Sequence, residues 1–102
     1  MKFLRTKEFD IWLSSIRDVV AKTHIVARVH RAQNGNFGDV ESIGNGLSEM
    51  RVHVGSGYRI YFARQGDVVY LLLLGGNKNT QPKDIARAKK LWADIQRSNK
   101  NG

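Results

Sequence analysis

The sequence predicts one α+β domain, with an N-terminal helical hairpin, a twisted antiparallel sheet and a closing C-terminal helix. Apolar residues recur at helical spacing over the first third of the chain and again after residue 80. Between them, residues 47–74 are rich in β-branched and aromatic residues, which is typical of strands. A chain of 102 residues is long enough for one hydrophobic core, so we expect a single domain over residues 1–102.

Two helices are predicted near the N-terminus, after a short strand over residues 2–5. Thr6 is a candidate N-cap for the first helix and Asp18 for the second, because short polar side chains accept hydrogen bonds from free helical N–H groups. The first helix is expected to bury Phe9, Trp12 or Leu13, Ile16 and Val20. The second is expected to bury Ala21, Ile25, Val29 and Ala32.

The sheet is predicted to be a meander of three antiparallel strands over residues 47–54, 58–64 and 68–74. The preceding segment, 34–46, is polar and glycine-rich, and we interpret it as a loop. Gly55-Ser56-Gly57 and Gln65-Gly66-Asp67 are expected to form the hairpin turns, and Gly75 and Gly76 to end the sheet.

The last helix is predicted to begin at Thr80 as N-cap, with Pro82 in its first turn. Its buried stripe is expected to consist of Ile85, Ala88, Leu91 or Trp92, and Ile95.

The chain is strongly basic, with 17 Lys and Arg against 9 Asp and Glu, a net charge of +8 and a pI near 10.2. Residues 76–102 contribute seven basic and two acidic groups, so +5 of this charge lies in the last quarter. Such an excess repels itself in a folded chain and usually serves an anionic partner. RNA is the partner that we expect.

No cysteine is present, so disulfides, thiolate metal sites and a cysteine nucleophile are excluded. The longest apolar run, residues 68–74, has seven residues and is too short to span a bilayer. We therefore expect a cytoplasmic protein without a membrane partner.

Candidate site residues gather on one face of the predicted hairpin. If Val54 opposes Tyr58, the alternation of side chains along strands places Arg51, His53, Arg59 and Tyr61 on the same face. Two arginines in cross-strand proximity repel each other, and a bound phosphate would remove that repulsion. An ordinary solvated sheet face, with Glu49 and Asp39 as counter-ions, is the alternative interpretation.

The residues 47–53, LSEMRVH, and 57–62, GYRIYF, resemble the RelE/ParE superfamily of bacterial toxins. The segment 72–85, LLLGGNKNTQPKDI, is similar to its HigB-type, phage Gp49-like branch, the addiction module killer proteins. The resemblance extends over nearly the whole chain.

What the resemblance implies is a ribosome-dependent mRNA endonuclease that needs no metal and no cofactor. The ribose 2′-OH would attack the adjacent phosphate. The implied partners are the ribosome, mRNA and a helix-turn-helix antitoxin, with operator DNA bound only through the antitoxin.

The resemblance also suggests roles for individual residues. Arg59 would clamp the phosphate, His53 would act as general base or acid, and Lys78 would stabilise the transition state or protonate the leaving oxygen. Substrate contacts are expected from Arg51, Gln81 and Tyr61, and docking onto ribosomal RNA from Lys83, Arg87 and Lys90.

The sequence departs from ribosome-dependent toxins at one place. Those proteins have a late tyrosine or histidine near the scissile phosphate, whereas the late aromatic here is Trp92, which we expect in the core. Two alternatives therefore stay open: a non-enzymatic ParE-like toxin that inhibits DNA gyrase, and a binding module that serves only its antitoxin and operator.

Overall fold

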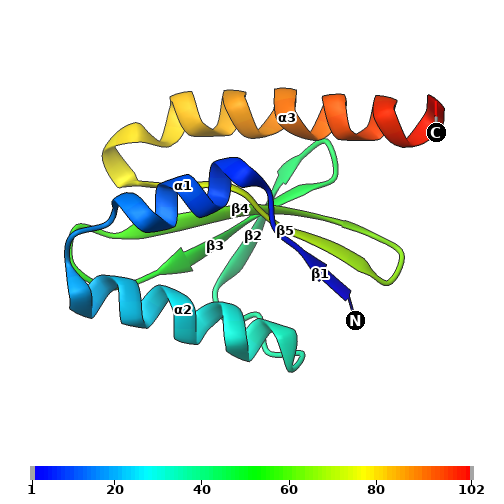
Figure 1. Ribbon diagram of the computed structural model, residues 1–102. Helices are drawn as coiled ribbons and strands as arrows, with labels where there is room; N and C mark the ends of the chain where they lie inside the picture. The colour runs from blue at the N-terminus through cyan, green and yellow to red at the C-terminus, as the bar shows by residue number, and fades with distance from the viewer. Residues whose placement is uncertain (1, 102) are drawn as a thin grey trace.

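A five-stranded sheet lies between two layers of helices in the computed structural model, which describes residues 2–101 except the side chains of 71, 72, 100 and 101. The strand order is β1-β5-β4-β3-β2 (Figure 1). The α+β prediction is confirmed. The elements are β1 (Lys2–Leu4), α1 (Lys7–Ser15), α2 (Val19–Gln33), β2 (Val40–Gly44), β3 (Leu47–Val52), β4 (Tyr58–Gln65), β5 (Val68–Asn77), the 3₁₀ turn η1 (Lys78–Thr80) and α3 (Gln81–Asn101).

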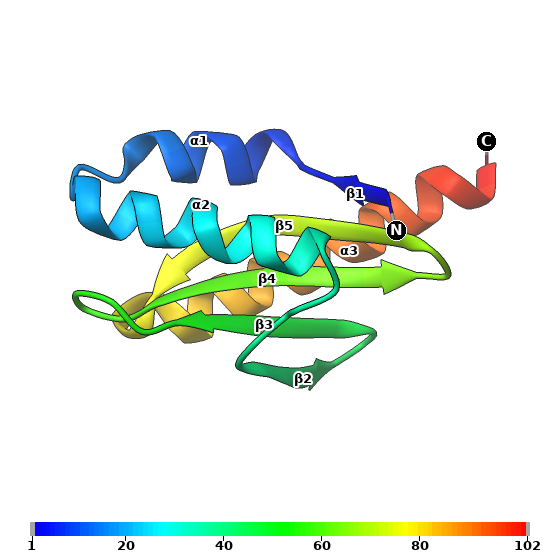
Figure 2. The same ribbon diagram turned by 90° about the horizontal axis from the view of Figure 1, so that it is seen from below.

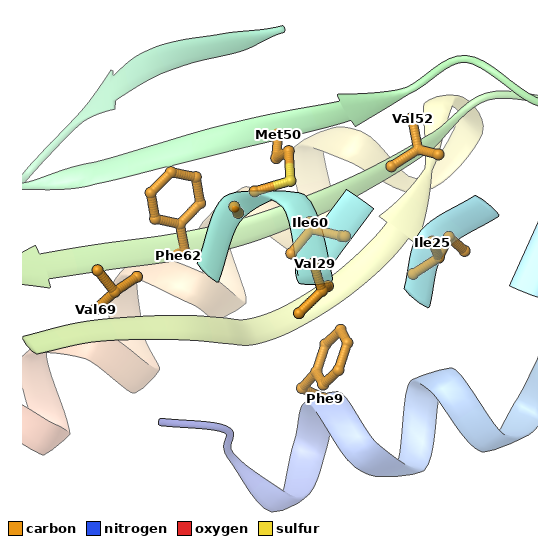
Figure 3. Close-up of a cluster of buried hydrophobic side chains, with 9 residues drawn as sticks. Phe9, Ile25, Val29, Met50, Val52, Ile60, Phe62 and Val69 are labelled. Atoms are coloured by element: carbon orange, nitrogen blue, oxygen red, sulfur yellow. The ribbon is translucent and has the colours of Figure 1, made fainter. Parts of the chain in front are cut away.

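Each face of the sheet has its own hydrophobic core, because α1 and α2 cover one face and α3 covers the other (Figure 2). The first core joins the two N-terminal helices to alternate residues of β3 and β4 (Figure 3). The second lies under α3 and contains Leu47, Tyr61, Ala63, Leu73, Leu74, Ala88 and Trp92. The sheet face that we expected to be polar is therefore half covered by a second core.

The helical hairpin follows the predicted caps. The Thr6 hydroxyl accepts from the Phe9 N–H at 3.0 Å and donates to the Leu73 carbonyl at 2.7 Å, which ties the start of α1 to β5. Asp18 accepts from the Ala21 N–H at 3.1 Å. The predicted buried stripe of α2 is confirmed in full, since all four of its residues are buried.

Val20 does not belong to the first stripe. It lies on α2 and is 62% exposed. A new helix begins at Val19, so the helical spacing counted from Phe9 is interrupted before it reaches this residue.

The sheet is larger and more varied than predicted. The edge strand β1 runs parallel to β5, with Phe3 opposite Val69, so the sheet is mixed and not purely antiparallel. The segment expected to be a loop contains β2, which pairs with β3 through a two-residue turn. Asn45 and Gly46 have φ values of 59° and 77° there, which suits the hairpin turn that Asn-Gly favours.

Strand β5 continues through Gly75 and Gly76, so the prediction that they end the sheet was wrong. A Cβ on Gly75 would overlap the ring of Trp12 from α1. A Cβ on Gly76 would overlap the carboxylate of Asp84 from α3. The two glycines are needed because a helix on each side approaches the strand backbone closely.

The chain leaves the sheet at Asn77, whose side chain accepts from the N–H groups of Asn79 and Thr80 at 2.8 and 3.2 Å. Asn77 caps the 3₁₀ turn η1, and the Thr80 side chain completes that capping box. Helix α3 then begins at Gln81, directly after the predicted N-cap position Thr80. The predicted apolar stripe of α3 packs on the sheet, with Ala88 and Trp92 buried. Among the described residues, no helix combines the length and apolar character that crossing a bilayer requires.

We expect Gly75→Ala to lower the free energy of unfolding by about 1–3 kcal/mol, because the added methyl overpacks the site against the Trp12 ring. Urea unfolding measures the loss. If the overlap with Trp12 is the cause, Gly75→Ala should cost much less in a Trp12→Ala background. Equal losses in both backgrounds would contradict the explanation.

Candidate functional site

The pairing of β3 with β4 differs from the predicted register by two residues. Arg51 lies opposite Arg59 and Val52 lies opposite Tyr58. Strand β3 ends at Val52, so His53 belongs to the connecting loop, residues 53–57. A shift of two residues keeps each side chain on its face, so the predicted pairs are wrong while the common face of the two arginines is right.

A cavity of about 400 Å³ opens beside this pairing, and we name it the basic cleft. Lys78 also lines the cleft. Its backbone N–H donates to the Gly57 carbonyl at 3.1 Å, and this hydrogen bond holds η1 against the β3–β4 loop. Four of the predicted site residues, Arg51, His53, Arg59 and Lys78, therefore line one opening. The complete lining is Arg51, Val52, His53, Val54, Gly55, Ser56, Gly57, Tyr58, Arg59 and Lys78.

Glu49 is the centre of the charge network behind the cleft. It is 3% exposed and accepts from Arg51 Nη2 at 3.2 Å, from Arg59 Nη1 at 3.4 Å and from Gln81 Nε2 at 3.0 Å. Gln81, expected to bind RNA, instead holds this carboxylate. An internal anion thus offsets the repulsion between the two arginines that the sequence predicted.

The two arginines differ in how many acceptors they already have. Arg51 contacts three carboxylates, those of Asp39 at 3.1 Å, Glu49 and Glu41. Arg59 has one described carboxylate partner, Glu49, and its Nε is buried with no hydrogen-bond partner among the described residues. Because the Nε of Arg59 is enclosed by the protein, the donors that a ligand in the cleft can meet are those of its two Nη groups, of which one is paired with Glu49. Arg51, by contrast, is largely occupied by the protein itself.

His53 and Asp39 form a hydrogen-bonded pair at the mouth of the cleft, with His53 Nε2 2.6 Å from Asp39 Oδ2. This hydrogen bond is the largest cause of a lowered pKa of Asp39, and the charge of Arg51 acts in the same direction. The His53 side chain is 73% exposed, so its ring can meet a ligand in solution.

Arg28 is a site residue that the sequence interpretation missed. Its guanidinium donates to the carbonyls of Arg51 at 2.9 Å and Phe37 at 2.8 Å. It thereby ties α2 to the end of β3 and to the segment that carries Asp39. Burial is the largest cause of a lowered Arg28 pKa. A single arginine on a helix gives no sequence signal for this role.

Tyr61 does not meet the cleft, which corrects its predicted contact with the substrate. It is 0% exposed, lies under α3, and its hydroxyl has no partner among the described residues. Burial, followed by the negative charges of Glu49 and Asp84, raises the pKa of the Tyr61 hydroxyl. Trp92 is buried in the same core, as predicted.

The three predicted docking cations, Lys83, Arg87 and Lys90, are all exposed on α3 and do not line the basic cleft. Their spacing of four and three residues places them on one face of the helix. Within residues 2–101, no three His, Cys, Asp or Glu side chains are grouped in a way that could hold a metal ion.

The chain is similar to an uncharacterized protein of Haemophilus influenzae strain Rd. The two are 49% identical over 90 residues, which cover 88% of this chain and 91% of the relative. No family model matches the chain, and no solved structure matches it. The similarity therefore extends over most of both chains and is not confined to one motif.

Glu49→Gln should lower the free energy of unfolding by about 2 kcal/mol, because it leaves the two partly buried arginines without their shared anion. Glu41→Gln is the matched control. Glu41 also pairs with Arg51 but its side chain is 59% exposed, so we expect a loss below about 1 kcal/mol. Urea unfolding of both variants tests this, and equal losses would contradict the central place of Glu49.

His53→Ala should raise the pKa of Asp39 toward its ordinary value, because the largest cause of the lowering is removed. A lowered pKa in the folded state contributes stability above the unfolded-state value, and this is lost as the pH falls through the folded-state value. In the variant this contribution is smaller, and what remains of it is lost at a higher pH than in the wild type. Carboxyl carbon shifts of Asp39 followed from pH 6 to pH 2 measure the change, and an unmoved titration midpoint would contradict it.

Proposed function

We propose that this chain, which belongs to one family with the uncharacterized Haemophilus influenzae protein, is a toxin of the RelE/ParE type. In this proposal it belongs to the HigB-like branch and cuts mRNA bound in the ribosomal A site. It acts in the cytoplasm, without metal or cofactor.

The observation that supports the proposal best is the composition of the basic cleft. Arg59 has donors to spare, Lys78 has no ion-pair partner among the described residues, and His53 is paired with Asp39. A guanidinium, an ammonium and an imidazole at one opening are the groups that RNA cleavage by its own 2′-OH requires.

The reaction is assigned to these three groups. With Nε2 donating to Asp39, His53 Nδ1 is left to take the proton of the 2′-OH. The 2′-oxygen bonds to phosphorus, the bond from phosphorus to the 5′-oxygen breaks, and the Lys78 ammonium gives that oxygen a proton. The products are a 2′,3′-cyclic phosphate and a free 5′-hydroxyl. Arg59 stabilises the charge that collects on the phosphoryl oxygens.

The exposed cations of α3 are assigned to the ribosome. Lys83, Arg87 and Lys90 form a row outside the basic cleft, so they can contact ribosomal RNA while the cleft holds mRNA. Binding of this kind releases counterions and weakens as the salt concentration rises.

An uncovered apolar strip on α2 supports a protein partner, which we propose to be the helix-turn-helix antitoxin. Val19 is 75% exposed and Val26 is 51% exposed, and both line a shallow hollow with Lys22 and His30. Residues 19–33 contain no Asp or Glu. The strip therefore suits an amphipathic segment that carries negative charge.

The test is cleavage of a message by purified ribosomes with and without the protein. We expect cuts that depend on translation and leave cyclic phosphate ends, and a loss of about 10²–10³-fold in rate for Arg59→Ala, as for other donors to a developing anion. Arg31→Ala removes the same charge from an exposed site on α2 and should change the rate less than twofold. Intact message together with inhibited supercoiling by DNA gyrase would reject the nuclease and favour the ParE-like alternative.

A further inference from the structure

A second pocket lies across the Asn77–Lys78 turn from the basic cleft, between α1 and α3. Its volume is about 390 Å³, and we name it the Trp12 pocket after one of its walls. Lys78 lines the cleft and Asn77 lines the pocket. Tyr58 of the cleft and Trp12 of the pocket are in contact, with ring centroids 6.4 Å apart. The two cavities are therefore neighbours separated by one turn and one aromatic pair.

Asp84 provides the pocket with a buried carboxylate. The residue is only 7% exposed, yet its one described hydrogen bond comes from the Thr80 hydroxyl, which reaches Oδ2. The other carboxylate oxygen has no partner among the described residues, and Asp84 lines the pocket. A buried carboxylate with free lone pairs is stabilised by a ligand that donates hydrogen bonds to it.

The remaining walls favour a flat ligand. Trp12 is half-buried and offers an aromatic surface, and Leu74 adds apolar area. Glu8 and Arg87 also line the pocket, so charges of both signs border it. An aromatic wall beside a carboxylate suits a nucleobase: the base stacks on the ring, and its amino edge donates to the carboxylate.

We propose that the Trp12 pocket binds a nucleobase that presents amino donors, with guanine preferred. Guanine offers adjacent N1–H and N2–H donors, which match a carboxylate, whereas uracil turns carbonyl oxygens toward it and is repelled. This inference rests on the proposed function in one respect, that the base belongs to the RNA strand whose phosphate occupies the basic cleft. The pocket then selects the nucleotide beside the cut.

The test uses the indole N–H signals of Trp12 and Trp92 in the NMR spectrum of the intact protein, titrated separately with guanosine and uridine monophosphate. The Trp12 signal should move with guanosine monophosphate, while Trp92, buried under α3, stays in place as an internal control. We expect guanosine monophosphate to bind at least about tenfold more tightly than uridine monophosphate, since one bidentate base contact is worth that or more.

Asp84→Asn should weaken binding of guanosine monophosphate at least about tenfold and remove the preference over uridine monophosphate. Asp10→Asn, an equal change on α1 outside the pocket, should leave both affinities unchanged. If Asp84→Asn does not fold, the affinities of the wild-type protein for the two nucleotides still test the inference. An unmoved Trp12 signal, or equal affinities for both nucleotides, would overturn the inference.

This experiment contains no ribosome and no cleavable bond. A protein that prefers guanine but cuts no message would refute the proposed nuclease and leave the pocket assignment intact. A protein that cuts messages but shows no preference in this titration would refute the pocket assignment alone.

Discussion

The buried carboxylate of Glu49 is the interaction on which the rest of the site depends. It lies on β3 beneath two guanidinium groups that the strand pairing places directly opposite each other. Without an anion at this position, the sheet would bring two like charges together in a partly buried setting. The same carboxylate accepts from Gln81, so the first residue of α3 is fixed to β3 by the same group.

This arrangement divides the work between the two arginines. Arg51 is occupied by three carboxylates and organises the segment that carries Asp39, which in turn orients His53. Arg59 has Glu49 as its one described carboxylate partner and lines the opening. An arginine in this cleft can thus stabilise the fold or bind a ligand, and the number of protein acceptors that already contact its guanidinium distinguishes the two roles.

The sequence was sufficient for the helical parts of the fold, because the stripes from Ala21 to Ala32 and from Ile85 to Ile95 repeat at a clear period. It predicted a short strand at β1 but not its parallel pairing, and it missed β2. The first is a three-residue strand whose parallel pairing depends on a distant segment, and the second lay in a polar stretch whose Asn45-Gly46 turn signal was undervalued. For the site, alternation predicted the shared face of Arg51 and Arg59. The burial of Glu49 and Tyr61 depended on where α3 packs, which no local pattern records.

The glycine pair in β5 has a wider consequence. At Gly75 and Gly76 no strand side chain keeps the helices away from β5, so Trp12 of α1 reaches the main chain at Gly75 and Asp84 of α3 reaches it at Gly76. Helices α1 and α3 therefore both contact β5 near the point where the strand leaves the sheet for η1. A displacement of α1 at this point is transmitted to α3 through a single thickness of peptide, without any intervening side chain to absorb it.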